Sequence, residues 1–231
     1  MDRPNFPHWT IMAFVEQLAE GTPLPGGGCA VSVAGALAAA LGSLSGQISQ
    51  RRAAGGQEQA VLAAMQPQLE RARQTFLELI DADALAYHEV VLARRRPHRT
   101  AAERSERAAA ISQAFERACE PPLAMARLGL EVLQWAAHLA ANGNPVVMAD
   151  VGVMGFLAWA VVHGGVVNVF ANLTMMAAAE AAAALRAEAA ALKSAAAQQG
   201  AAFAQLLYGR LEDGREPAGQ ASGAGAAASA G

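Results

Sequence analysis

The stretch from Gly28 to Gly46 reads GCAVSVAGALAAALGSLSG, and this stretch decides the fold class. Small residues recur in it at alternating steps of four and three, which places them on one face of a helix. A face without large side chains lets a neighbouring helix come unusually near. The sequence therefore predicts a long central helix from about Cys29 to Arg52, and the small residues on its face are Gly28, Ser32, Gly35, Ala39, Gly42 and Gly46.

Composition supports helices throughout the chain. Hydrophobic residues make up 54% of the 231 residues, much of that share is alanine, and aromatic residues contribute only 5%. Alanine is the best helix former, and this length suits one domain with a sizeable core. We therefore expect an all-α, single-domain helical bundle over residues 1–211, with long central helices rich in alanine and glycine. Residues 212–231 are mostly Gly, Ala and Ser and are expected to form a disordered tail.

Punctuating residues predict where the other helices begin and end. Prolines and glycines make residues 21–28 a loop, whereas Pro97 and the pair Pro121-Pro122 interrupt later helical patterns. Asn144-Pro145 is a start signal for a helical pattern that runs to about Leu211, with Gly164-Gly165 as a place where it would bend. The other predicted helices are Thr10–Glu20, Gln57–Arg94, Thr100–Cys119 and Leu123–Asn142.

Charge and cysteine usage exclude several classes of protein. The net charge is −3 with a pI near 6.0, so no overall positive field attracts nucleic acid. Cys29 and Cys119 belong to no CxxC pattern, which argues against a disulfide framework and a zinc site. The five histidines show no HxH or HExxH spacing, so we expect no metal. No apolar signal core follows the first residues, which indicates a cytoplasmic protein.

Two runs without charged residues raise a membrane alternative. Residues 21–50 and 151–179 contain no Asp, Glu, Lys or Arg, as membrane spans often do. Both runs, however, are rich in Gly, Ala, Ser and Asn and sparse in the large apolar residues that usually face lipid. The interpretation that we prefer is a pair of buried central helices in a soluble bundle, with no membrane.

Asp83 is the most informative single position. Steps of 100° place it in the middle of an apolar face that includes Ile80 and Tyr87, while Asp81 falls on the opposite, polar side. A carboxylate within an apolar stripe has a raised pKa unless it is paired, which suits a general acid or base. The alternative is an Asp that bonds a neighbouring helix end or an arginine, and the residues alone leave both open.

Other polar residues are candidates for ligand binding. The glycines Gly26, Gly27 and Gly28 open directly into a helix, where free backbone N–H groups bind anions, although they also suit a tight turn and close packing. Asn168 and Asn172 lie one turn apart and present either amides to a ligand or hydrogen bonds between helices. Asp150 begins the second uncharged run as a helix cap or as a second acidic group.

A cluster of basic residues follows Val91. Arg94, Arg95, Arg96, His98 and Arg99 form a local positive run in an otherwise acidic chain. A solvated loop explains the run, and so does a site for a ligand that carries carboxylates.

Taken together, these segments resemble the cyclodeaminase/cyclohydrolase family of folate enzymes. The resemblance covers roughly residues 9–205 and follows the order of the chain. Cys29 stands where the family usually has Ser, Leu24 where a small residue is common, Ala149 replaces Ser, and Arg96-Pro97-His98 replaces Leu-Pro-Lys. The matching segments are Thr22–Ala30, Ala34–Leu37, Leu79–Tyr87, Pro122-Leu123, Asn144–Asp150, Gly165, Asn168-Val169 and Asn172-Leu173.

The resemblance implies a function and a set of site residues. It implies a helical homodimer that binds a tetrahydrofolate derivative as substrate in a cleft near the subunit contact, without metal or permanently bound cofactor. Asp83 and Asp150 are then the candidate catalytic residues. The candidate substrate-binding residues are Gly26, Gly27, Gly28, Tyr87, His98, Asn168 and Asn172.

Several functions remain compatible with this resemblance. The first is hydrolysis of 5,10-methenyltetrahydrofolate to 10-formyltetrahydrofolate, preferred because no formiminotransferase domain is present in this sequence. The second is formiminotetrahydrofolate cyclodeaminase, which expels ammonia. A non-catalytic folate-binding protein and a structural helical oligomer are the alternatives from other classes.

Overall fold

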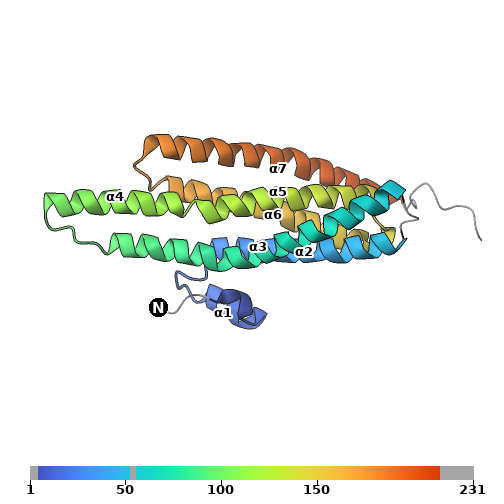
Figure 1. The fold of residues 1–231 in the computed structure, drawn as a ribbon, viewed down its shortest axis with the longest axis horizontal. Coiled ribbons are helices and arrows are strands. Elements are labelled where there is room, and N and C mark those ends of the chain that lie inside the picture. Colours follow the sequence, from blue (N-terminus) through green and yellow to red (C-terminus); the bar gives the residue numbers. More distant parts are fainter. Residues whose placement is uncertain (1–4, 53–55, 214–231) are drawn as a thin grey trace, which may run out of the picture.

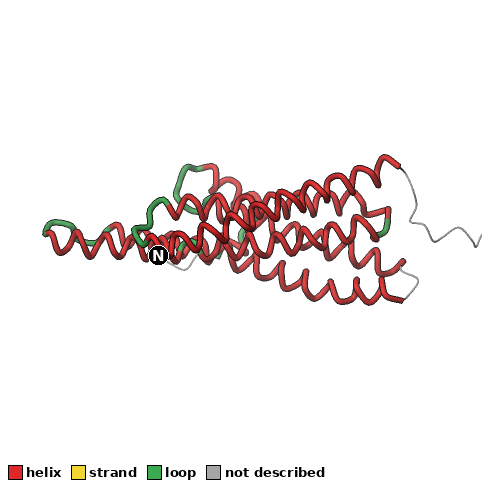
Figure 2. Tube along the Cα trace, turned by 90° about the horizontal axis from the view of Figure 1, so that it is seen from above, coloured by secondary structure: helices red, strands yellow, loops and turns green. Residues whose placement is uncertain are grey.

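The protein is an elongated bundle of helices, described by a computed structural model over residues 5–52 and 56–213 (Figure 1). Within these residues there is no β-strand, and the predicted all-α class is confirmed (Figure 2). The elements are η1 (Phe6–His8), α1 (Ile11–Ala19), α2 (Gly27–Arg52), α3 (Gly56–Arg94), α4 (Ala101–Arg117), α5 (Glu120–Asn142), η2 (Pro145–Val147), α6 (Met148–Leu173) and α7 (Ala179–Asp213).

The small residues of α2 form the seam on which the bundle closes. All six predicted positions are buried, and α3 packs against them. A Cβ at Gly35 would overlap the ring of Phe76, so the missing side chain makes room for a ring of α3. Gly42 leaves room for Leu69 of α3 and for Met154 of α6 in the same way. The predicted close packing is confirmed, and large side chains of the partner helices fill the space.

Helices α3 and α6 run antiparallel to α2. Near the beginning of α2, Val31 lies against Gly164 of α6, and near its end Ser49 receives a hydrogen bond from the backbone N–H of Asn144 at 2.9 Å. α5 and α7 cover the other sides of α6. α3 and α4 form a hairpin whose tip extends beyond the other helices (Figures 1 and 2).

Most predicted helix boundaries agree with the structure. The Thr10 and Thr100 side chains cap α1 and α4, and Thr100 forms a capping box with Glu103. Asn144 caps η2 through its side chain. α2 begins at Gly27, two residues before the predicted start, because glycine tolerates the first helical turn as well as the loop.

The prediction of one continuous last helix was wrong, because the structure has two helices there. The chain leaves the helix after Leu173 and begins α7 at Ala179, whereas the prediction ran one helical pattern to about Leu211. The predicted bend at Gly164-Gly165 falls inside α6, which continues through both glycines, and these lie against Val31 and the carbonyl oxygen of Pro122. Of the predicted disordered tail, Glu212 and Asp213 belong to α7, and residues 214–231 lie outside the described residues.

The two uncharged runs lie mostly in α2 and α6. Within the described residues, Gly27–Arg52 and Pro145–Leu173 are long and apolar enough to cross a membrane by length and composition alone. Core helices of bundles share these properties, and both segments pack against other helices of the bundle along their length. About half of the most apolar window of each is buried, at 44% and 50%.

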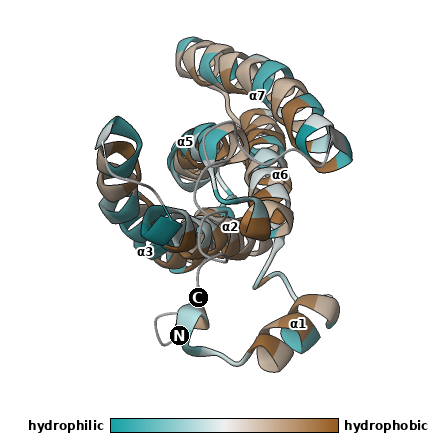
Figure 3. Ribbon diagram, turned by 90° about the vertical axis from the view of Figure 1, so that its right-hand side faces the viewer, coloured by the Kyte–Doolittle hydropathy of each residue, from teal (hydrophilic) through white to brown (hydrophobic). Residues whose placement is uncertain are grey.

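Helix α1 lies apart from the main bundle (Figure 3). Phe14 attaches it by packing into a small cluster with Phe6, Cys29 and Ile80. The backbone N–H of Phe6 donates a 3.0 Å hydrogen bond to Asp81 of α3. Asp81 therefore does not simply face solvent as predicted, since it fixes the N-terminal segment to the bundle.

Candidate active site

The carboxylate of Asp83 lies at the beginning of α2. A Cβ at Gly28 would overlap this carboxylate, which shows how closely α3 and the first turn of α2 approach. The Sγ atom of Cys29 lies 3.6 Å from Oδ2 of Asp83, at the distance of a weak thiol hydrogen bond. The orientation predicted for Asp83, toward the apolar face of its helix, is what the structure has, and its partner is a helix N-terminus.

Burial dominates the electrostatics of Asp83. It raises the pKa of this carboxyl above its usual range, and hydrogen bonds from the Cys29 side chain and backbone lower the pKa in part. In the described part of the chain, no ion pair reaches Asp83. The carboxylate is thus a half-buried base at a positive helix end, without an arginine or lysine partner among the described residues.

Asn168 extends the site from α6. Its side-chain Nδ2 donates to the carbonyl oxygen of Gly164 at 2.8 Å, which orients the amide. The other end of the amide, Oδ1, faces Gly27, where a Cβ would lie 3.9 Å from it. Asp83, Gly27, Gly28 and Asn168 are therefore brought together from three helices. Gly26 joins them as the residue whose carbonyl accepts the first hydrogen bond of α2, from Ala30.

Tyr87 and Asn172 lie one turn further along their helices. Because α3 and α6 both run antiparallel to α2, these two residues extend past the point at which α2 begins. Tyr87 is partly buried. Asn172 has a structural contact, since its Nδ2 donates at 2.7 Å to the carbonyl oxygen of Ala118 and so holds the end of α4.

Two predicted site residues, Asp150 and His98, lie far from Asp83 in the same chain. Asp150 is in the first turn of α6, roughly 27 Å along that helix from Asn168 at 1.5 Å per residue. His98 is exposed in the loop at the tip of the α3–α4 hairpin, beyond Arg94, which itself lies roughly 17 Å along α3 from Asp83. A single chain brings neither residue to Asp83.

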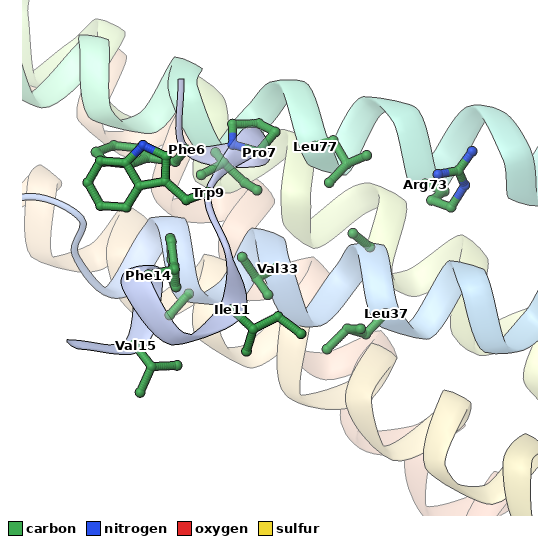
Figure 4. A pocket seen from close by; sticks show the side chains of 13 residues that line it. Phe6, Pro7, Trp9, Ile11, Phe14, Val15, Val33, Leu37, Arg73 and Leu77 are labelled. Carbon is green, nitrogen blue, oxygen red and sulfur yellow. The ribbon is translucent and has the colours of Figure 1, made fainter. Parts of the chain in front are cut away.

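An apolar groove that sequence reasoning missed lies on the outer flank of α2 and α3 (Figure 4). Its volume is about 390 Å³, and η1 and α1 form one wall. Arg73 is the one charged residue in its lining, and this side chain is paired with Glu70. The groove contains Ile80, one turn before Asp83, but none of the polar residues of the site. Its sequence signal was the aromatic residues Phe6, Trp9 and Phe14 near the N-terminus.

The described residues contain no group of three or more His, Cys, Asp or Glu side chains that would hold a metal ion. The groups that this site offers are a carboxylate, a thiol, an amide oxygen and backbone N–H groups. They suit proton transfer and recognition of a polar, flat ligand.

Comparisons with known proteins agree with this geometry. The chain is 34% identical to methenyltetrahydrofolate cyclohydrolase of Methylorubrum extorquens over 163 residues, which covers 71% of this chain and 78% of that protein. It is 30% identical to formimidoyltransferase-cyclodeaminase of Gallus gallus over 161 residues, 70% of this chain and 30% of the much longer animal protein.

Solved structures and family models give the same result. The fold matches formiminotetrahydrofolate cyclodeaminase of Thermotoga maritima with a TM-score of 0.78 at 22% identity, covering 89% of this chain and 99% of that one. The model of the formiminotransferase-cyclodeaminase family matches residues 10–191. The chain therefore belongs to the formiminotransferase-cyclodeaminase family.

Proposed function

We propose that this protein hydrolyses 5,10-methenyltetrahydrofolate to 10-formyltetrahydrofolate. The observation that carries the proposal is the half-buried, unpaired carboxylate of Asp83, held beside Gly28 and facing the end of the bundle where Asn168 lies. The similarity to a methenyltetrahydrofolate cyclohydrolase over 78% of that protein's length supports this choice among the folate reactions.

The proposed chemistry needs one base. The methenyl carbon, bonded to N5 and N10 of the folate, is a cationic electrophile. Water adds to it, and Asp83 takes a proton from the water as the carbon–oxygen bond forms. The bond from this carbon to N5 then breaks, N5 keeps the electron pair and receives a proton, and the formyl group stays on N10. One proton is released overall, and the charged form of Asp83 also attracts the cationic substrate.

The neighbouring residues have proposed roles in binding. The Oδ1 atoms of Asn168 and Asn172 would accept hydrogen bonds from the polar edge of the pterin, with Tyr87 against its flat face. Backbone N–H groups of Gly26 to Gly28 would hold a negatively charged or carbonyl oxygen of the ligand. His98 and its neighbouring arginines would meet the glutamyl carboxylates at the far end of the substrate.

A homodimer is part of the proposal. The outer face of α1 carries large apolar side chains that no described residue covers, since Ile11 is 84% exposed, Met12 69% and Val15 55%. Leu37 of α2, at 52% exposed, extends this surface along the groove. Faces of this kind usually pack against another protein, and a second copy of the chain is the occupant that we propose.

We further propose that the protein works in the cytoplasm, without contact to a membrane and without a permanently bound cofactor. The mechanism above needs water and a base alone. The buried, unpaired thiols of Cys29 and Cys119 suit a reducing compartment.

The test is loss of the methenyl absorbance of 5,10-methenyltetrahydrofolate on addition of purified protein. Spontaneous hydrolysis is subtracted, in a buffer that does not itself catalyse the reaction. Turnover by the wild type supports the proposal. Tight binding without turnover would contradict it and identify a folate-binding protein.

The second candidate is formiminotetrahydrofolate cyclodeaminase. The fold match to the Thermotoga maritima protein and the similarity to the Gallus gallus protein favour it. Ammonia release from 5-formiminotetrahydrofolate separates the two reactions, because the hydrolysis of the methenyl compound releases none.

A further inference from the structure

Cys29 lies beside Asp83 and also belongs to the apolar cluster that Phe6, Phe14 and Ile80 form beneath α1. The residue is fully buried in the first turn of α2. Its Sγ atom lies 3.6 Å from Oδ2 of Asp83 and 3.5 Å from the carbonyl oxygen of Ile80. One thiol has a single proton, so these two acceptors compete for it.

We propose that Cys29 is a positioning residue, whose thiol shares its proton between the Ile80 carbonyl and the Asp83 carboxylate and thereby sets the orientation and basicity of that carboxylate. The inference rests on the proposed function, in which Asp83 is the base. It concerns a residue at which this chain departs from the serine that its sequence family usually carries.

The thiol of Cys29 is protonated at neutral pH. Burial, reinforced by the negative charge of Asp83, raises the pKa of Cys29 to about 12. Cys29 is therefore a hydrogen-bond donor and not a nucleophile. Because S–H is a weaker donor than O–H, it stabilises the charged carboxylate less than a serine hydroxyl at this position would.

Few other titratable or charged groups are near enough to Asp83 to affect its titration. On its own helix the titratable neighbours are Asp81, which bonds Phe6 on the other side, and Tyr87 one turn on. α6 presents the uncharged amide of Asn168, and α2 presents Cys29 itself. No Arg, Lys or His of the described residues pairs with Asp83. Changes at Cys29 should therefore show directly in the titration of Asp83.

The Gly28 backbone makes the contact sensitive to geometry. The carboxylate of Asp83 already occupies the space that a side chain at Gly28 would take. The thiol then determines which carboxylate oxygen stays directed at α2 and which faces the open end of the bundle. A residue without a donor would leave this choice to the backbone N–H of Cys29 alone.

The direct test is a carbon-13 NMR titration of the Asp83 carboxyl, with the signal assigned by its loss in Asp83→Asn. Wild type is compared with Cys29→Ser, Cys29→Ala and Cys29→Val, where valine fills the space without a donor. The expected order of the Asp83 pKa is lowest with serine, intermediate in the wild type and highest in the two variants without a donor. A valine variant that titrates with the wild type or below it would overturn the proposal.

The other buried thiol provides a matched control. Cys119 lies at the end of α4, 4.0 Å from the carbonyl oxygen of Val169, and does not contact Asp83. Cys119→Ser and Cys119→Ala should leave the titration of Asp83 unchanged. A shift with these variants equal to that at position 29 would show a general effect of loosened packing and would overturn the specific role of Cys29.

Kinetics then separate this inference from the proposed function. The acid limb of kcat/KM for hydrolysis of the methenyl substrate should move in the same order as the NMR titration. The ordered titration without turnover in any variant would uphold the Cys29–Asp83 contact and sink the proposed function. If the variants turn over substrate but the acid limb of kcat/KM does not follow the order of the Asp83 pKa values, the proposed effect of Cys29 on catalysis is overturned.

Discussion

The Asp83 carboxylate occupies the space that a Cβ of Gly28 would take, so no side chain fits between α3 and the first turn of α2 at this point. Asp83 and Gly28 therefore behave as one unit, in which the glycine fixes the position of the carboxylate. This contact also joins the two features that the sequence singled out separately, the glycine-rich loop and the acidic residue in an apolar face.

We expect Gly28→Ala to lower kcat/KM by about 100-fold, because a catalytic group displaced by about 1 Å loses activity of this order. The new methyl group would push the Asp83 carboxylate aside. The measurement is steady-state hydrolysis of the methenyl substrate.

Two other glycines serve as controls for this variant. Gly35→Ala overlaps the Phe76 ring and should lower stability by about 1–3 kcal/mol, as overpacking does, without a comparable loss of kcat. Gly209 on α7 faces open space, so Gly209→Ala should lower neither the stability nor kcat. Equal losses of activity in the variants at positions 28 and 35 would show that the effect is one of folding.

Replacing Asp83 should separate activity from stability. Asp83→Asn is expected to lower kcat by about 10²–10⁴-fold, the usual contribution of a general base. Its melting temperature at neutral pH should equal or exceed that of the wild type, because burial disfavours the charged carboxylate. Activity close to that of the wild type in a folded Asp83→Asn protein would move the chemistry to another residue.

The pH dependence of activity and of stability should run in opposite directions at Asp83. The pKa of this group is raised in the folded protein, so the folded state binds its proton more tightly than the unfolded chain does. Its contribution to stability is full below the unfolded pKa and is lost as the pH rises through the folded pKa. Activity needs the charged base and should rise over that same range.

This comparison is made by chemical denaturation and by kcat/KM across the acid range, for wild type and Asp83→Asn. The difference in unfolding free energy between the two proteins isolates the contribution of Asp83. A difference that does not vary with pH would contradict the raised pKa.

Asp150 is expected to act mainly as an acidic residue at a helix start. It lies in the first turn of α6, where a carboxylate contributes about 0.3–1 kcal/mol. Asp150→Asn should therefore retain kcat within about tenfold and lose a small amount of stability. A mixture of Asp83→Asn and Asp150→Asn proteins provides the decisive control. If Asp150→Asn proved inactive instead, recovery of activity on mixing it with Asp83→Asn would place Asp150 of a second copy in the site.

The proposed dimer should depend on α1. The double change Ile11→Glu and Val15→Glu puts two charges on its exposed apolar face and should shift sedimentation toward the monomer. Val146→Glu is the matched control, since this side chain is 77% exposed at the other end of the bundle and should leave the mass unchanged. A dimer that survives the double change would place the contact elsewhere.

Local patterns in the sequence predicted much of the fold. The periodic small residues of α2, the capping residues Thr10 and Thr100, and the inward face of Asp83 each depend on a few neighbouring positions. The break between α6 and α7 was missed because residues 174–178 contain no glycine or proline. Polar contacts with Ser112 and Ala171 stabilise the turn there.

Contacts between segments that are distant in the sequence could not be predicted from such local patterns. The sequence left open whether Asn172 binds a ligand or bonds between helices, and it could not identify the partner, which is the carbonyl oxygen of Ala118, 54 positions away. Asp81 was assigned to solvent because its helix face is polar, but Phe6 reaches it from the N-terminal segment. The separation of Asp150 from Asp83 follows from antiparallel packing, which places the beginning of α6 beside the end of α2. His98 is separated from Asp83 because α3 continues from Asp83 to Arg94 before the loop begins.

The direction of α7 has a practical consequence for joining this bundle to other proteins. Leu207 packs against Gly152 near the start of α6, and Arg210 donates to the carbonyl oxygen of Ala140 near the end of α5. Asp213 thus leaves the bundle at the end opposite to Asp83 (Figure 1). A reporter or a second enzyme fused after this helix would be tethered a full bundle length from the reacting carbon, with access for substrate left open.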